Sequence, residues 1–215
     1  MTPENNPKRR YDTARRRATA GERRLAVVAA AREAFEERGW AGTRVQDVSS
    51  AAGVSPKTVE AVFGTKAALL QAAVDYGIRG DVEPVPMPER ESILEMERAP
   101  NAPAMLRLHA RHLRAVNARS ARIAAVVEQA AAADPAVGAM WTRMNRNREY
   151  AVDWATTTLF ATRGRRRGLT PAAASSIFWI ALDWATFRTL TSLAGLDADG
   201  YEAWLNEYYR RMLLP

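Results

Sequence analysis

The sequence predicts an all-α protein of about nine helices, with an N-terminal helix-turn-helix head and a larger helical body for ligand binding and dimerisation. Three observations support this fold class. No segment alternates between apolar and polar residues with the period of two that marks a half-buried strand. Pairs that favour a helix start, Ser55-Pro56 and Thr170-Pro171, occur in both parts. Residues 81–88, DVEPVPMP, contain three prolines, which cannot continue a helix and therefore separate head from body.

Residues 43–66, TRVQDVSSAAGVSPKTVEAVFGTK, carry the signals of a helix-turn-helix unit. Thr43 followed by Gln46 predicts a capping box at the start of one helix. Gly53 lies where the chain must reverse, because glycine adopts a positive φ without steric cost. Ser55 is a favoured N-cap for the next helix. Such a unit usually places its second helix in the DNA major groove, although an ordinary helical hairpin without DNA is the alternative.

At these residues the chain resembles the TetR family of transcriptional regulators. The similarity extends upstream through residues 25–42, where Phe35, Gly39 and Trp40 resemble the end of the family's first helix, and downstream through residues 66–76, which resemble its fourth helix. It covers about the first third of the chain. The resemblance implies a homodimer that binds double-stranded DNA at a palindromic operator, usually as a repressor. It also implies an effector pocket in the body and coupling through the fourth helix.

The resemblance also places DNA-facing positions on both helices of the unit and at the start of the following one: Thr43, Arg44, Ser55, Lys57, Thr58, Glu60, Val62 and Lys66. Glu60 and Val62 depart from the family pattern, which often has aromatic residues or histidine there. Glu60 repels phosphates but can accept a hydrogen bond from a cytosine amino group. The departure therefore leaves the operator sequence open, while the DNA-binding role stands.

Positive charge is concentrated at the N-terminus. Residues 1–24 hold eight Lys or Arg against three acidic residues, in a chain whose net charge is +7. Residues 1–18 contain few apolar side chains, which predicts a disordered basic arm ahead of a DNA-binding domain at 19–80 and a body at 81–215. We expect Arg15, Arg16 and Arg17 to follow phosphates or to enter a minor groove. A solvated tail is the alternative.

Several function classes are disfavoured by what the sequence lacks. It has no cysteine, which excludes disulfides and thiolate metal sites. His109 and His112 lie three residues apart, but no further ligands follow at a metal-binding spacing, so we expect no metal and no cofactor. Catalytic motifs are missing, and an enzyme is not expected. Without a long apolar run the expected location is the cytoplasm, with no membrane partner.

The body is rich in tryptophan and methionine, which can line an adaptable apolar cavity. We therefore expect a small, largely apolar or aromatic effector to bind at Met105, His109, His112, Trp141, Met144, Asn145, Trp154, Trp179, Asp183 and Phe187. Each of these aromatic residues has an alternative role in the core or in a dimer interface. A DNA-binding protein without an effector, either a constitutive repressor or an architectural protein, remains the alternative function.

The two C-terminal helices, predicted at 171–194 and from about residue 200 to 213, carry broad apolar faces. Faces of this width often bury against a second copy, so we expect a dimer interface at Ile177, Trp184, Thr191, Tyr201, Trp204 and Tyr208. Packing within one chain is the alternative. The RGRRRG segment at 163–168 is predicted to be a solvated basic turn.

Overall fold

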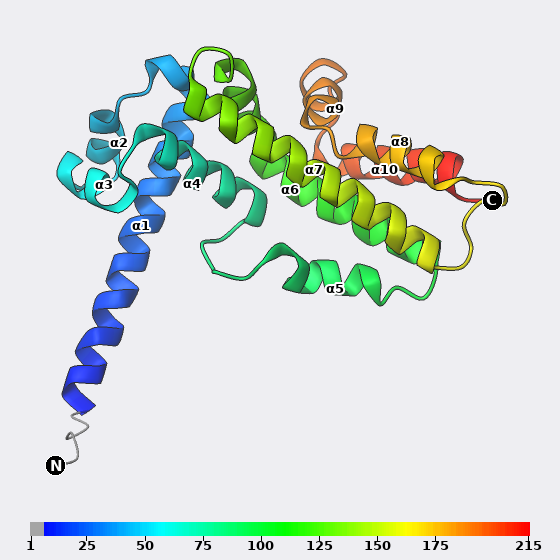
Figure 1. Ribbon diagram of the computed structural model, residues 1–215, viewed down its shortest axis with the longest axis horizontal. Coiled ribbons are helices and arrows are strands. Elements are labelled where there is room, and N and C mark those ends of the chain that lie inside the picture. Colours follow the sequence, from blue (N-terminus) through cyan, green and yellow to red (C-terminus); the bar gives the residue numbers. More distant parts are fainter. Residues whose placement is uncertain (1–6) are drawn as a thin grey trace. The chain divides into compact units, whose positions relative to one another are not determined.

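The computed structural model describes the backbone of residues 7–215 and the side chains from residue 20 onward, and it confirms the all-α fold (Figure 1). Within this range there are ten α-helices, a 3-10 turn, η1 (Met87–Glu89), and a π-helical turn, η2 (Thr189–Leu193). No helix of the described part is long and apolar enough to cross a membrane. The chain divides into two compact units, Met1–Ala73 and Val74–Pro215. This division falls inside the fourth helix, earlier than the predicted boundary after residue 80.

The first unit contains α1 (Pro7–Gly42), α2 (Val45–Ala51), α3 (Pro56–Phe63) and the first half of α4 (Lys66–Arg79). α1 includes residues 7–18, which belong to the arm expected at 1–18. This stretch has no glycine or proline after Pro7, and its five arginines and two alanines favour helix. The regular part of α1 ends at Gly39, whose φ is 68°.

The core of the first unit follows the helical period. Val27, Val28, Ala31 and Phe35 of α1 are buried, and these positions recur every three or four residues on one face. Buried side chains of the other helices complete this core, namely Val48, Val59, Leu69 and Leu70. The apolar pattern therefore fixes which faces of α2 and α3 remain exposed.

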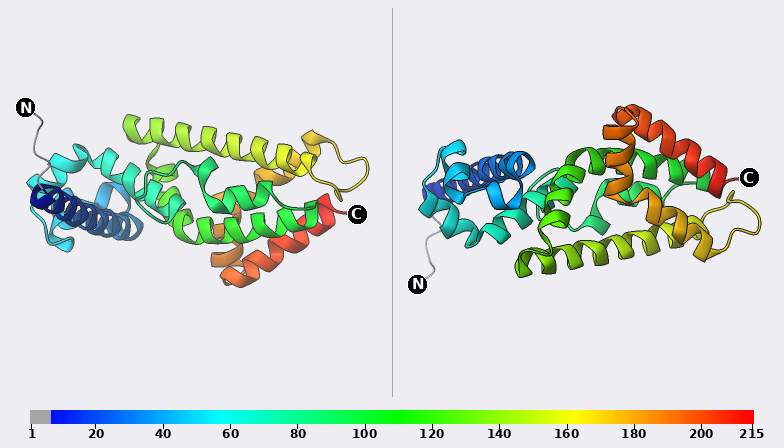
Figure 2. Two further views of the ribbon diagram at one scale, coloured as in Figure 1. Left: turned by 90° about the horizontal axis from the view of Figure 1, so that it is seen from below. Right: turned by 90° about the horizontal axis from the view of Figure 1, so that it is seen from above.

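The second unit is built around α6 (Ala102–Ala130), which contacts α5 (Glu91–Glu97), α7 (Pro135–Ala161), α9 (Trp184–Arg188) and α10 (Ala198–Leu213). α8 (Pro171–Ala181) packs on α7. The two long helices α6 and α7 stand out in both views of Figure 2. Their buried faces, together with Phe178, Tyr201 and Tyr209, form one continuous apolar core.

Polar groups inside this core are paired, as buried polar groups must be. The Nδ1 atom of His109 lies 2.8 Å from the Tyr209 hydroxyl, and the Asn117 side-chain amide donates to the Tyr201 hydroxyl at 2.9 Å. Both pairs join α6 to α10. The Trp184 indole NH donates to the Ser120 hydroxyl at 3.1 Å, which joins α6 to α9.

Most helix starts agree with the sequence. Ser55, Asp134, Thr170 and Asp197 each accept a hydrogen bond from a backbone NH of the first turn that follows. The helix predicted at 171–194 is interrupted, however. The Asp183 carboxylate accepts from the Ala185 NH at 3.1 Å and caps a new helix, α9. A short polar side chain that bonds nearby backbone in this way competes with the continuous helix.

The basic segment at 163–168 is more than a solvated turn. The Arg165 guanidinium donates to the carbonyls of Phe160 and Thr162, at the C-terminal end of α7. The backbone NH of Arg166 donates to the Leu213 carbonyl at 2.8 Å, and its guanidinium donates to the Arg211 carbonyl. Cationic side chains satisfy the unpaired carbonyls at helix C-termini. The segment therefore fastens the ends of two helices.

Candidate functional site

The turn between α2 and α3 has the geometry that the sequence predicts. Gly53 has a φ of 65°, and the Val54 NH donates to the Ser49 carbonyl at 3.0 Å, which closes the turn. The Ser55 hydroxyl then accepts from the Thr58 NH at 3.1 Å and starts α3. Val59 is buried, so α3 is held by one face and presents the opposite one.

The exposed surface of α3 has a mixed chemical character. Lys57, Thr58, Glu60 and Ala61 are exposed, and Val62 is 48% exposed. Arg44, just before α2, is exposed as well. Such a surface offers cations for phosphates, a carboxylate for a base amino group, and an aliphatic group for a thymine methyl.

Thr43 differs from the prediction in two respects. The N-cap position of α2 is Arg44, which makes no side-chain capping bond, so the predicted capping box does not form. Thr43 is only 2% exposed. Its hydroxyl donates to the Ala34 carbonyl at 3.0 Å and to the Gly39 carbonyl at 2.8 Å. The hydroxyl is thus used inside the unit, where it ties the start of α2 to the end of α1.

Lys66 also has a different setting from the expected one. Its ammonium lies 4.3 Å from the centre of the Trp40 ring and donates to the Trp40 carbonyl. Attraction between a cation and an aromatic face adds to this hydrogen bond. Both contacts stabilise the C-terminal end of α1. The side chains of Arg15, Arg16 and Arg17 lie outside the described side chains.

The residues predicted for the effector pocket lie in different settings. Met105, His109 and Met144 are buried in the core. Burial, and then the charge of His112, lower the pKa of His109 from 6.5 to about 3, so that it stays neutral in the core. The Phe187 ring stands edge-on to the Tyr201 ring at 4.7 Å, which is core packing.

The remaining aromatic candidates have partners of their own. The Trp154 indole NH donates to Glu97 at 2.9 Å, while Trp141 lies 6.3 Å from Trp184. The Arg148 guanidinium lies 4.9 Å from the Trp179 ring, and it pairs with Asp183 at 2.9 Å. Asn145 donates to the carbonyl of Trp141 one helical turn earlier.

Three of the six residues predicted for the dimer interface are instead buried within the chain. These are Ile177, Trp184 and Tyr201, whose side chains fill the core of the second unit. Trp204 and Tyr208 stack on each other at 5.1 Å and are partly buried, and the Thr191 hydroxyl donates to the Phe187 carbonyl. These three residues therefore pack within one chain, which is the alternative to a dimer interface.

A different part of α8 is apolar and exposed. Trp179 is 36% exposed and Ile180 is 50% exposed. Ala172, Ala173 and Ser176 lie one and two turns earlier and are exposed too. Residues three or four apart share a helix face. α8 therefore carries an exposed stripe of small and large apolar side chains.

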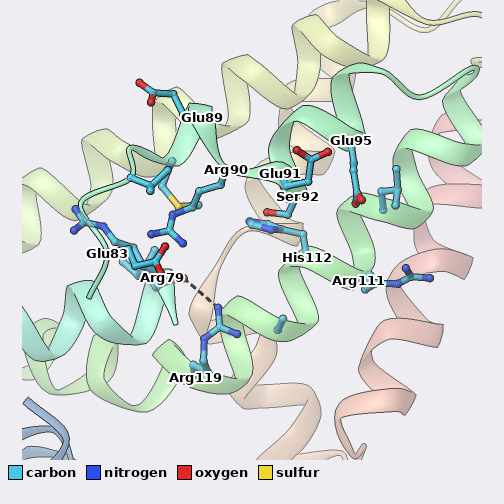
Figure 3. A pocket seen from close by; sticks show the side chains of 15 residues that line it. Arg79, Glu83, Glu89, Arg90, Glu91, Ser92, Glu95, Arg111, His112 and Arg119 are labelled. Atoms are coloured by element: carbon cyan, nitrogen blue, oxygen red, sulfur yellow. Dashed lines mark hydrogen bonds between the residues drawn. The ribbon is translucent and has the colours of Figure 1, made fainter. Parts of the chain in front are cut away.

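A pocket of about 510 Å³ opens in the second unit, between the last turn of α4, the segment that follows it, α5 and α6 (Figure 3). Of the ten residues predicted for ligand binding, only His112 lines it. The other lining side chains are mostly charged or aliphatic, namely Ile78, Arg79, Glu83, Val85, Met87, Glu89, Arg90, Glu91, Ser92, Glu95, Leu108, Arg111, Ala115 and Arg119. The volume suits a small molecule, but the lining is charged where an aromatic one was expected.

His112, which lines this pocket, and Asp81, which binds the lining residue Arg90, have shifted pKa values. Burial, and then the charge of Arg119, lower the pKa of His112 from 6.5 to about 4, so its ring is neutral at pH 7. Asp81 accepts two hydrogen bonds from the Arg90 guanidinium, at 2.7 and 2.9 Å, which lower the pKa of Asp81 to about 2. This bidentate pair holds the segment after α4 against the start of α5.

The sequence holds a signal for this pocket in its charged residues, and the aromatic residues gave no indication of it. Glu91 and Glu95 lie four apart on α5, and Arg111, Ala115 and Arg119 lie at intervals of four on α6. Such intervals place the charges on one face of each helix. Within the described residues, no group of three or more His, Asp or Glu is placed to hold a metal ion.

Comparison with known proteins now gives this geometry a context. Residues 27–73 match the model of the bacterial regulatory proteins of the tetR family. No curated protein matches the chain. Among solved structures, a TetR-family transcriptional regulator from a Rhodococcus species superimposes with a TM-score of 0.64 at 20% identity, covering 89% of this chain and 98% of that one.

Two further structures have the same fold. A transcriptional regulator from Saccharomonospora viridis, solved in complex with choline, gives a TM-score of 0.65 at 15% identity over 90% of this chain and 98% of that one. NalD, the secondary repressor of the MexAB-OprM multidrug efflux pump in Pseudomonas aeruginosa, gives 0.64 at 20% identity over 91% and 98%. The likeness of all three lies in the fold.

Proposed function

We propose that this chain is a sequence-specific DNA-binding repressor released from its operator by a small molecule, since residues 27–73 match the model of the tetR family of bacterial regulatory proteins. The observation that carries the proposal is the exposed surface of α3, with Lys57, Glu60 and Val62 on a helix anchored by the buried Val59. A recognition helix needs this combination of a fixed inner face and an exposed polar outer face.

The proposal assigns different roles to the exposed residues. Arg44 and Lys57 neutralise phosphates and supply affinity without sequence preference. Glu60 accepts a hydrogen bond from a cytosine amino group, and Val62 contacts a thymine methyl. We assign no direct DNA contact to Thr43 or Lys66, because their polar groups form hydrogen bonds inside the first unit.

We further propose a homodimer that binds a palindromic operator through two copies of α3. The exposed stripe of α8, with Trp179 and Ile180 at its centre, supports this, since contiguous exposed apolar surface marks interaction sites. An interface in which two copies of this stripe face each other uses the same surface of both chains, so it joins two chains and stops at a dimer. The stripe therefore replaces Ile177, Trp184 and Tyr201 as the proposed interface.

Release by a small molecule is supported by the pocket beside the end of α4. Ligand binding and repression are each known for a protein of this fold: the Saccharomonospora viridis regulator is in complex with choline, and NalD is a repressor. A ligand changes the DNA-bound population only if it binds the released state more tightly than the bound state. The charged lining of this pocket favours a polar effector over the aromatic one expected from the sequence.

The test is binding of the full chain to labelled palindromic DNA from the region flanking its own gene, measured across a series of salt concentrations. We expect sequence-dependent binding whose affinity falls steeply with salt. Lys57→Ala and Arg44→Ala should each reduce the salt slope by about two, which is about one for each copy in the dimer. Arg146→Ala, which removes an exposed arginine of α7, is the matched control and should leave the slope unchanged. Binding that ignores sequence would indicate an architectural protein, and a folded chain that binds no DNA would overturn the proposal.

A further inference from the structure

The chemistry of the pocket beside α4 narrows the class of its ligand. Four of its charged side chains come from three different helices (Figure 3). Arg79 ends α4, and Arg119 lies far along α6, whereas Glu91 and Glu95 both belong to α5. In Figure 3, His112 lies between these two groups. Glu83 also lines the pocket and lies beside Arg79 in Figure 3, so the part near α4 and Arg119 holds one carboxylate among its arginines, and the part near α5 holds Glu91 and Glu95. Positive charge is in excess at the first part, called the cationic end, and negative charge at the second, called the anionic end.

The cationic end is held in place by the fold. Arg119 donates to the carbonyls of Gly77 and Ile78, at 3.2 and 3.3 Å, in the last turn of α4. A Cβ atom on Gly80 would lie 3.1 Å from the Arg119 guanidinium, so that glycine leaves room for it. The charge of Arg119 is thus held at the last turn of α4, and Arg79 of that turn lines the same pocket. Two neighbouring cations attract an anionic group more strongly than either does alone.

The anionic end has a carboxylate to offer. Within the described residues, Glu95 has no ion-pair or hydrogen-bond partner, and it is exposed. Glu91 pairs with Arg98 only at the surface, at 3.1 Å, and exposed pairs of this kind contribute little. Arg111 lines the same end, but Figure 3 shows its guanidinium pointing away from His112. An ammonium group is the natural partner of these carboxylates.

The middle of the pocket is uncharged. His112 is neutral at pH 7, because burial lowers its pKa, and Leu108 and Ala115 of α6 lie one turn to either side of it along the helix. From His112 to Arg119 the helix rises roughly 10 Å, at about 1.5 Å per residue. A ligand that spans the pocket therefore needs charged groups separated by a short, mainly apolar body.

We propose that this pocket binds a small zwitterion, with its anionic group against Arg79 and Arg119 and its ammonium group against Glu91 and Glu95. A carboxylate and a phosphate would both suit the cationic end. A monoanion or a monocation leaves one charged end of the pocket without a partner, and it therefore binds more weakly. The inference rests on the proposed function only in taking this pocket as the effector site.

The test uses ω-amino acids as probes, with calorimetric titration of the full chain in the absence of DNA. ω-Aminohexanoate and ω-aminooctanoate carry both charges, whereas hexanoate, octanoate, hexylamine and octylamine carry one. We expect the dissociation constant of the better zwitterion to be lower than that of either single-charge analogue by at least about tenfold, the effect of one charge-assisted hydrogen bond. Equal affinities for zwitterions and single-charge analogues, or no binding of any zwitterion, would overturn the inference.

Variants locate the two ends. Arg79→Gln should weaken binding of the zwitterion and of hexanoate about tenfold and leave binding of hexylamine unchanged. Glu95→Gln should weaken binding of the zwitterion and of hexylamine about tenfold and leave binding of hexanoate unchanged. Arg146→Gln and Glu149→Gln, which neutralise exposed residues of α7, are the matched controls. Zwitterion binding that survives both pocket variants would place the ligand elsewhere and refute the assignment.

The outcome is separable from the test of DNA binding. A chain that binds its operator but no zwitterion keeps the proposed function and loses this inference. A chain that binds the zwitterion through Arg79 and Glu95 but binds no operator keeps the inference about the pocket and loses the function. A zwitterion of matched length that carries a phosphate, 5-aminopentyl phosphate, compared with ω-aminohexanoate then distinguishes the two kinds of anionic group.

Discussion

Thr43 shows how one hydroxyl can be assigned the wrong role by its neighbours in sequence. Its position before a helix and its spacing from Gln46 are typical of a capping box. In the structure the side chain is buried, and its hydroxyl bonds to carbonyls at the end of α1. A buried hydroxyl donor with two acceptors in reach stabilises the fold.

Replacement of this hydroxyl by a methyl group tests the role. Thr43→Val keeps the shape but leaves the Ala34 and Gly39 carbonyls without this donor, so we expect the free energy of unfolding to fall by about 1–3 kcal/mol. The measurement is urea denaturation of the full chain. Ser50→Ala, which removes an exposed hydroxyl of α2, is the control and should change stability by less than about 0.5 kcal/mol. A variant that keeps its stability but loses DNA affinity at every salt concentration would show that the hydroxyl contacts the DNA after all.

The two histidines predict a pH dependence. Both are held neutral in the folded chain, with pKa values of about 3 for His109 and about 4 for His112, below the ordinary 6.5. Below pH 6.5 the unfolded chain binds protons that the folded chain does not, so stability falls as the pH is lowered. The loss ends near pH 4 for His112 and near pH 3 for His109.

Each pKa unit of difference corresponds to about 1.4 kcal/mol, so we expect His112 alone to remove about 2 kcal/mol between neutral pH and about pH 5. Denaturation at a series of pH values measures this, and His112→Gln should flatten the curve in that window. Asp81, whose pKa is lowered to about 2, loses its contribution only below 3.8 and is therefore distinguishable. A curve that His112→Gln leaves unchanged would contradict the assignment.

At the scale of elements, α4 and α6 approach closely at Gly77. A Cβ atom there would lie 3.3 Å from the Arg119 carbonyl oxygen and from the Ser120 Cα atom. Both atoms belong to the backbone of α6, which cannot move aside as a side chain can. The absence of a side chain at Gly77 is therefore what lets the two helices meet.

Gly77→Ala should accordingly lower the free energy of unfolding by about 1–3 kcal/mol, through overpacking. The matched control is Gly21→Ala in α1, where a Cβ atom meets nothing within 4 Å. There the same change should stabilise the helix by about 0.5–1 kcal/mol. Thermal denaturation of both variants measures the difference. Equal effects of Gly77→Ala and Gly21→Ala would mean that α6 shifts to make room for the added methyl group.

At the scale of the whole molecule, the exposed stripe of α8 predicts self-association. Ile180→Glu places a charge in the middle of the stripe, and the cost of burying that charge should convert a dimer into a monomer. Size-exclusion chromatography with light scattering measures the mass. Tyr150→Glu, at an exposed aromatic residue of α7, is the control and should leave the mass unchanged. If Ile180→Glu remains a dimer, a different face forms the interface.

The sequence by itself determined the class of the fold, the starts of its helices and the helix-turn-helix unit. These features depend on local chemistry: Ser55, Asp134, Thr170 and Asp197 bond to backbone NH groups within their own first turns. Local bonds can be read from neighbouring residues. For the same reason the turn at Gly53 agrees with the structure.

The roles of larger side chains were decided only by the tertiary structure. An apolar face in the sequence indicates burial but not the surface that covers it. Ile177, Trp184 and Tyr201 are therefore buried in their own chain, although the pattern suited a dimer equally well. The charged pocket likewise depends on which faces of α4, α5 and α6 meet, and these helices come together through contacts between residues distant in sequence. Such long-range packing is a property of the whole chain, and no single segment encodes it.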